Sequence, residues 1–238
     1  MQETRHQFHE DLRETEQQVL GGLEIIVDQL DRALEAVALR DVELAQMVVA
    51  DDDRIDGRYL EVHQSILSLL ARQAPVAGDL RIVAALLHVV RCMERMGDQC
   101  ANIAKLVPLS GHETPNDTQV LEEIEEMGRL ARLQLVQSRE AFAGRDLALA
   151  QVLVGQDAEI NRLNRRVFRR AVEIGDDVEL REWGMYMILV ARCLERIGDN
   201  TVDIAEQVVF VVTGLFREMD QTLSGADEGR LLSGDSGV

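Results

Sequence analysis

The sequence predicts an all-α protein made of two copies of a three-helix unit. Only three of the 238 residues are proline and 3% are aromatic, a composition typical of long helices rather than of a β-sandwich or barrel. A fourteen-residue motif occurs twice, at 91–104 and 192–205, with eight identical positions. Self-similarity at a fixed offset indicates a duplicated unit, and the duplication favours two smaller cores over one large one.

The first half begins with two amphipathic segments. In the first, apolar residues recur at steps of three, four or seven, at Phe8, Leu12, Val19, Leu23, Ile26, Leu30 and Val37. Arg40-Asp41 interrupts this pattern, and Asp41 is suited to cap the next helix. That second helix ends near Pro75, because the residue before a proline is disfavoured in the α conformation. Its apolar stripe consists of Val48, Ile55, Tyr59, Val62, Ile66 and Leu69.

A third helix is expected from Asp79, a suitable N-cap, to Pro108, which closes it. Its apolar positions follow alternating steps of four and three, which places them in one narrow sector of the helix. They are Ile82, Leu86, Val89, Met93, Met96, Cys100, Ile103 and Val107.

The second half repeats this plan. Its second helix matches the first half at an offset of 105 and its last helix at 101, so we expect a connecting loop four residues shorter, without the proline. The last apolar seam comprises Trp183, Met187, Val190, Leu194, Ile197, Thr201, Ile204 and Val208. The predicted boundaries are a first bundle at 1–108, a linker at 109–118, a second bundle at 119–219 and a disordered tail at 220–238.

Charge and cysteine usage exclude several classes of function. The net charge of −18, with basic residues interspersed among acids, repels nucleic acid and anionic lipid. Three cysteines without a CxxC pair fit a reducing cytoplasm rather than a disulfide framework. We expect no signal peptide and no membrane insertion, since apolar runs such as 208–215 are far shorter than the ~20 residues a span needs.

Acidic side chains form a regular pattern on the predicted helices. At about 100° per residue, Asp98 lies opposite the apolar seam of its helix, with Glu94 and Asn102 on either side. Asp52 and Asp56 flank the stripe of the second helix, and Asp157 and Asn161 occupy the corresponding positions in the second half. We therefore expect pairs of acids four residues apart that converge on one outer face of each half.

Two interpretations of these acids stay open. Like charges at this spacing cost about 0.2 to 0.5 kcal/mol per pair, which a cation would offset, and oxygen donors favour Mg²⁺, Mn²⁺, Ca²⁺ or iron and can bind zinc. Alternatively, Arg91 with Glu94 and Arg95 with Asp98 are surface ion pairs. Gly97 repeats as Gly198, and because glycine costs about 1 kcal/mol in a helix interior, the repetition suggests close helix approach or crowding at the site.

Other candidate chemistry is weak. His88 corresponds to Leu189 in the second half, so the sequence does not favour His88 as a metal ligand. Cys92 and Cys193 are expected to be small buried residues. No HxxxH pair, phosphate-binding glycine loop or Ser-His-Asp set is present. The sequence therefore offers no catalytic residues.

The residues resemble the PhoU family, cytoplasmic regulators of phosphate uptake. The resemblance rests on 73–81, on Glu94-Arg95-Met96-Gly97-Asp98 with Asn102-Ile103-Ala104, and on the copy at 195–199, and it covers about residues 5 to 217. It implies two tandem, pseudo-symmetric three-helix bundles that bind metal ions, in the family sometimes iron or zinc clusters. Carried over by position, the metal ligands are Asp52, Asp56, Glu94, Asp98, Asn102, Asp157, Asn161, Glu195, Asp199 and Asp203.

The implied metal is iron, zinc, magnesium or manganese. The second site should bind it more weakly, because Asn161 replaces the Asp56 carboxylate of the first half. The implied function is negative regulation of phosphate uptake and starvation signalling without catalysis. The expected partners are a phosphate ABC transporter ATPase, a sensor histidine kinase and a second copy of the chain, which would place the protein at the inner membrane only through contacts. A metal-dependent helical enzyme and a plain acidic scaffold are the alternatives.

Overall fold

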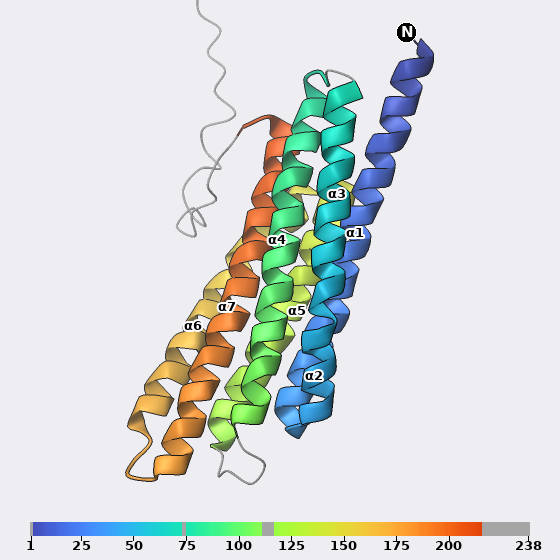
Figure 1. Cartoon of the computed structure of the whole chain (residues 1–238). Coiled ribbons are helices and arrows are strands. Elements are labelled where there is room, and N and C mark those ends of the chain that lie inside the picture. Colours follow the sequence, from blue (N-terminus) through green and yellow to red (C-terminus); the bar gives the residue numbers. More distant parts are fainter. Residues whose placement is uncertain (1, 73–74, 111–116, 216–238) are drawn as a thin grey trace, which may run out of the picture.

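The computed structural model describes residues 2–72, 75–110 and 117–215, which form long helices connected by short loops (Figure 1). The helices of the first half are α1 (Gln2–Leu39), α2 (Val42–Ala50), α3 (Asp52–Arg72) and α4 (Gly78–Leu106), followed by the 3₁₀ turn η1 (Val107–Leu109). Those of the second half are α5 (Thr118–Gly144), α6 (Leu147–Glu173) and α7 (Val178–Thr213). The all-α prediction is confirmed. The predicted tail and most of the predicted linker lie outside the described residues.

The second predicted helix of the first half is divided in two. Asp51 separates α2 from α3, and its backbone N–H still donates to the carbonyl of Met47 at 3.0 Å. Its carboxylate accepts a hydrogen bond from Arg32 of α1 at 2.7 Å. Three consecutive aspartates are poor helix formers, and Asp51 has a better partner on α1. In α6 the corresponding segment is one continuous helix.

Four helices begin with an aspartate N-cap. Asp41, Asp117, Asp146 and Asp177 each accept a hydrogen bond from a backbone N–H of the first turn, which satisfies donors that have no partner within the helix. The prediction for Asp79 was wrong: α4 begins at Gly78 with Ala77 as its N-cap. The Asp79 carboxylate instead lies 3.2 Å from Nε2 of His9 on α1.

The shortening of the second half falls mainly on a helix rather than on the loop. Helix α6 ends at Glu173, whereas the position that corresponds to Arg72, the last residue of α3, is Asp177. The expectation that the loop alone loses residues was therefore wrong. Because α6 ends earlier than α3, Asp177 lies outside the helix and serves as the N-cap of α7.

The two halves pack through equivalent helices. Helix α4 lies alongside α7 over much of its length (Figure 1) and α1 contacts α5. All predicted seam residues of α7 are buried, and so are those of α4 apart from the partly exposed Ile82. The buried apolar residues form one continuous cluster that includes Leu23 and Leu86 of the first half and Leu135 and Leu194 of the second. The expected pair of separate cores is thus a single shared core.

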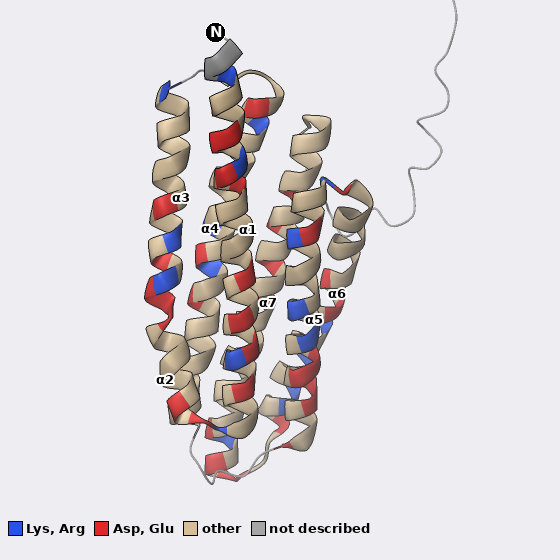
Figure 2. Ribbon diagram, turned by 90° about the vertical axis from the view of Figure 1, so that its right-hand side faces the viewer, with Lys and Arg blue, Asp and Glu red and all other residues tan. Residues whose placement is uncertain are grey.

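Charged side chains are mixed over the helix surfaces. Figure 2 shows basic residues interspersed with acidic ones along α3 and α5, and several form ion pairs, such as Arg132 with Asp31 at 2.7 Å between the two halves. Within the described residues, no helix carries an apolar stretch long enough to cross a bilayer.

Candidate carboxylate sites on the two halves

The first-half site lies where α3 passes α4. Asp52 and Asp56 are one helical turn apart on α3, and Glu94 and Asp98 are one turn apart on α4. Asp56 and Asp98 are exposed, whereas Asp52 and Glu94 are partly buried. The predicted outward direction of this set is therefore confirmed, with two of its carboxylates set back from solvent.

Electrostatic repulsion connects these four groups. Burial raises the pKa of Asp52, and the neighbouring charges of Asp98 and Asp56 raise it further. The pKa of Glu94 is raised by burial and then by Asp98 and Asp56. Asp52 and Glu94 therefore each hold a proton more tightly than a free carboxylate does. A bound cation would replace that proton and offset the repulsion.

A buried glutamine close to Asp52 was missed in the sequence. The side chain of Gln29 on α1 is completely buried and donates a hydrogen bond to the backbone carbonyl of Val48 at 3.4 Å, and its amide lowers the pKa of Asp52, which burial and the charges of Asp98 and Asp56 raise. Gln134 is its counterpart at the offset of 105, also completely buried. The repeat alignment could have identified it, because a glutamine retained at the same position of two otherwise apolar seams indicates a polar neighbour.

The second-half site is arranged differently. Asp157 is only 2% exposed and accepts a hydrogen bond from the Asn161 amide at 2.6 Å. The prediction that it faces outward was therefore wrong. Glu195 forms an ion pair with Arg192, so three of the four equivalent positions, Asp157, Asn161 and Glu195, already have polar partners within their own helices.

Asp199 and Asp203 continue along α7. Burial raises the pKa of Asp199, Arg192 offsets part of this rise, and Asp203 adds to it. Burial also raises the pKa of Asp203, and the neighbouring His88 and Arg95 on α4 partly offset this rise. Asp203 therefore faces α4 across the contact between the halves. Asn102, its counterpart at the offset of 101, is exposed.

The predicted ligands fit a cation in chemistry but are not gathered around one point. They supply oxygen donors and mutual repulsion, as hard cations require. Throughout the described ranges, however, these carboxylates contain no set of three with oxygens all within 4.8 Å of one another. The set that meets this criterion combines Asp203 with His88 and Cys92 of α4. Binding at the predicted first-half site would therefore require side-chain movement.

Comparison with known proteins places these sites within a family. The sequence profile of the PhoU domain matches twice, at residues 22–107 and 124–208, and these segments contain all ten predicted ligands. The chain belongs to the PhoU family. The recognition made from the duplicated motif is thereby confirmed, as are the paired three-helix units of the fold.

Relatives match this PhoU family chain over most of its length. A phosphate-specific transport system accessory protein PhoU homolog of Clostridium acetobutylicum is 29% identical over 213 residues, which are 89% of this chain and 96% of that protein. The corresponding Caulobacter vibrioides protein is 33% identical over 197 residues, 82% of this chain and 84% of its own length. The family is one of non-catalytic accessory and regulatory proteins, which agrees with the expectation of a regulator rather than an enzyme.

Solved PhoU structures share the fold. The crystal structure of the phosphate transport system regulatory protein PhoU from Streptococcus pneumoniae has a TM-score of 0.82 at 27% identity, and it covers 89% of this chain and all of that one. PhoU from Pseudomonas aeruginosa has a TM-score of 0.81 at 27% identity, with 87% of this chain and all of that one covered.

The ion-pair interpretation holds in one PhoU repeat and not in the other. Arg192 pairs with Glu195 in the second repeat. In the first, neither Arg91 with Glu94 nor Arg95 with Asp98 comes within ion-pairing distance among these described residues. The first-half carboxylates therefore remain available to a ligand.

The two mid-helix glycines also differ in role. A Cβ at Gly97 would lie 3.0 Å from two side-chain carbons of Ile55, so this glycine permits the close approach of α3 to α4. A Cβ at Gly198 would lie 2.9 Å from Oδ1 of Asp157 and 3.2 Å from Oε1 of Gln134. The expectation of close approach or crowding is thus realised in both forms, one in each half.

Proposed function

We propose that this chain is a negative regulator of phosphate uptake and phosphate-starvation signalling. It acts in the cytoplasm as an adaptor between the ATPase of a phosphate ABC transporter and the associated sensor histidine kinase. The observation that carries the proposal is the double PhoU domain match, together with near full-length relatives that are named phosphate-specific transport system accessory proteins. Its charge of −18 disfavours direct attachment to anionic lipid, so partners would bring it to the inner membrane.

Deletion in the native host tests the regulatory role. With phosphate abundant, we expect phosphate-starvation genes to become expressed in the deletion strain, and a plasmid copy of the chain to silence them again. Unchanged expression in high phosphate would overturn the proposal. A pull-down from phosphate-replete cells, with this chain as bait, tests the adaptor: the ATPase and the kinase should co-purify, and the same bait in starved cells provides the comparison.

We further propose that the first-half carboxylates bind a divalent or trivalent metal ion of the iron, zinc, magnesium or manganese group. The support is the raised pKa of Asp52 and Glu94, which reflects repulsion that a cation would offset. Protein purified without a tag or chelator should contain metal by elemental analysis, and Asp98→Ala should reduce the amount. Metal-free protein that also fails to bind added metal would favour the plain acidic scaffold.

The proposal includes a homodimer. Light scattering coupled to size exclusion should give about twice the chain mass of 26.7 kDa, and a single-chain mass across the accessible concentration range would contradict it.

A further inference from the structure

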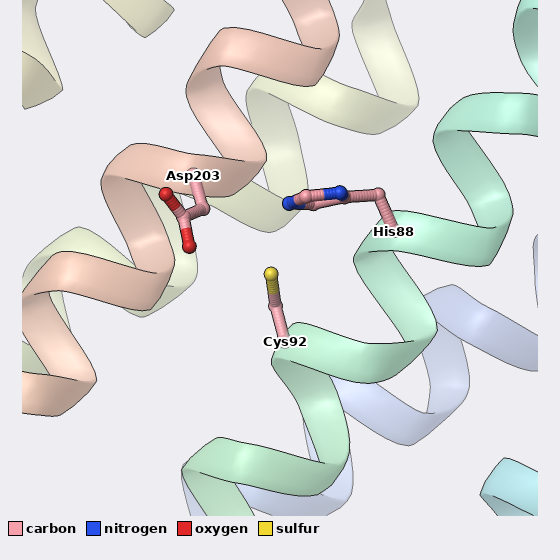
Figure 3. Close-up of side chains that lie close together, drawn as sticks. All are labelled: His88, Cys92 and Asp203. Carbon is pink, nitrogen blue, oxygen red and sulfur yellow. The ribbon is translucent and has the colours of Figure 1, made fainter.

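Three unlike side chains meet where the two halves pack together. His88 and Cys92 lie one turn apart on α4, and Asp203 approaches from α7 (Figure 3). One donor atom from each, an imidazole nitrogen, the Cys92 sulfur and a carboxylate oxygen, lie within 4.8 Å of one another. Of the three residues, only Asp203 belongs to the acidic pattern described above. The set joins the two halves, because His88 and Cys92 lie on α4 and Asp203 lies on α7.

We propose that His88, Cys92 and Asp203 form a binding site for a zinc-type transition metal between the two halves. Nitrogen and sulfur donors select borderline metals such as Zn²⁺ and Co²⁺ over Mg²⁺ and Ca²⁺. Three protein ligands leave the fourth tetrahedral position to water, the arrangement of an open zinc site. When the metal binds, the Cys92 thiol releases its proton to solvent. The resulting thiolate and the Asp203 carboxylate together carry two negative charges, which balance a divalent ion.

The three side chains differ in exposure. Cys92 is 1% exposed and Asp203 is partly buried, while His88 is exposed. The set therefore runs from the surface into the contact between the halves. The close-up shows the imidazole and the carboxylate flanking the sulfur from opposite helices (Figure 3).

The corresponding positions of the other repeat lack these ligands. By the offset of 101, His88, Cys92 and Asp203 correspond to Leu189, Cys193 and Asn102. Only the cysteine is shared, so the duplication that generated the acidic motif does not account for the His-Cys-Asp set. The chain thus offers this site on one side of its pseudo-twofold axis, and the opposite side provides an internal control.

Titration of the reduced, metal-free full chain with Co²⁺ tests the proposal. We expect a sulfur-to-cobalt charge-transfer band in the near ultraviolet that saturates at one ion per chain, and Zn²⁺ should abolish it by displacement. Cys92→Ser should remove the band, whereas Cys193→Ser should leave it unchanged. His88→Leu introduces the residue of the other repeat at an exposed position, so folding is not at risk, and it should weaken Co²⁺ binding at least about 10-fold.

The result does not depend on the acidic sites. Asp98→Ala should leave the band and its midpoint unchanged, which separates failure of this site from failure of the first-half metal site. The proposal is overturned if the wild-type chain gives no thiolate band. It is equally overturned if the band persists in Cys92→Ser or if His88→Leu binds Co²⁺ as tightly as wild type.

Discussion

At the scale of single residues, equivalent positions of the two repeats face different neighbours. Gly97 accommodates the apolar side chain of Ile55, while Gly198 accommodates the carboxylate of Asp157. Glu94 is repelled by Asp98 and Asp56, whereas its counterpart Glu195 is neutralised by Arg192. Because the two residues of each pair occupy equivalent positions of the repeat, the same substitution in both halves provides a matched comparison.

Gly97→Ala should destabilise the protein although alanine favours helix. The added methyl would press on Ile55, which is 2% exposed and has little room to move. Overpacking of this kind costs about 1 to 3 kcal/mol, against a gain of about 1 kcal/mol in helix propensity, so we expect a net loss of about 1 kcal/mol in urea unfolding.

Gly155→Ala is the control for this change. Gly155 lies within α6, and apart from its chain neighbours and the adjacent helix backbone nothing lies within 4 Å of the added Cβ, so this substitution should raise the free energy of unfolding by about 0.5 to 1 kcal/mol. Equal effects of the two substitutions would mean that Ile55 does not constrain Gly97.

Glu94→Gln should stabilise the metal-free protein at neutral pH. The pKa of Glu94 is raised in the folded state, so the folded chain retains a proton that the unfolded chain has already released. The stability from this proton is complete below a pH of about 4.5, the ordinary value, and is lost as the pH rises through the folded-state pKa. We expect a gain of up to about 0.5 kcal/mol at pH 7, measured by urea unfolding in chelator.

The same substitution in the second repeat should act in the opposite direction. Glu195→Gln removes the ion pair with Arg192 and should lower stability by about 0.5 kcal/mol. At pH 4 the benefit of Glu94→Gln should vanish. A benefit that persists at pH 4 would show that charge repulsion is not its cause.

At the scale of elements, the helix pair α3–α4 presents a fuller acid set than α6–α7. The first pair carries four mutually repelling carboxylates, whereas the second buries Asp157 against Asn161 and pairs Glu195 with Arg192. Asp98→Ala should therefore reduce Mn²⁺ affinity, by titration calorimetry on the full chain, at least about 10-fold more than Asp199→Ala does. Equal losses from the two variants would contradict the ranking of the sites.

Helical periodicity was sufficient to predict the long helices and their buried faces, but not the division of one predicted helix into α2 and α3. The seams of α4 and α7 follow from spacing alone, because an apolar stripe of that length has no other stable environment. The division at Asp51 was not predictable, since it depends on Arg32 of α1. The burial of Asp157 depends on how α6 packs against α7, and the meeting of His88 with Asp203 depends on how α4 packs against α7. The pattern within one helix encodes neither contact.

At the scale of the whole molecule, the shared core predicts a single unfolding transition. The one tryptophan, Trp183, is buried in the second half, whereas far-ultraviolet circular dichroism reports helices of both halves. Because α4 packs on α7 within one continuous apolar cluster, the two signals should give coincident urea curves. Loss of the Trp183 signal at a lower urea concentration than the helical signal would indicate halves that unfold independently.

The packing of α4 on α7 gives the molecule the character of a dimer joined by a peptide tether. In a true homodimer every substitution appears twice, once on each side of the axis. Here the tether keeps the halves together at high effective concentration and leaves each copy free to change alone. His88 lies on one side of the axis while Leu189 occupies the equivalent position on the other. The two halves can therefore differ in function while the packing between them is preserved.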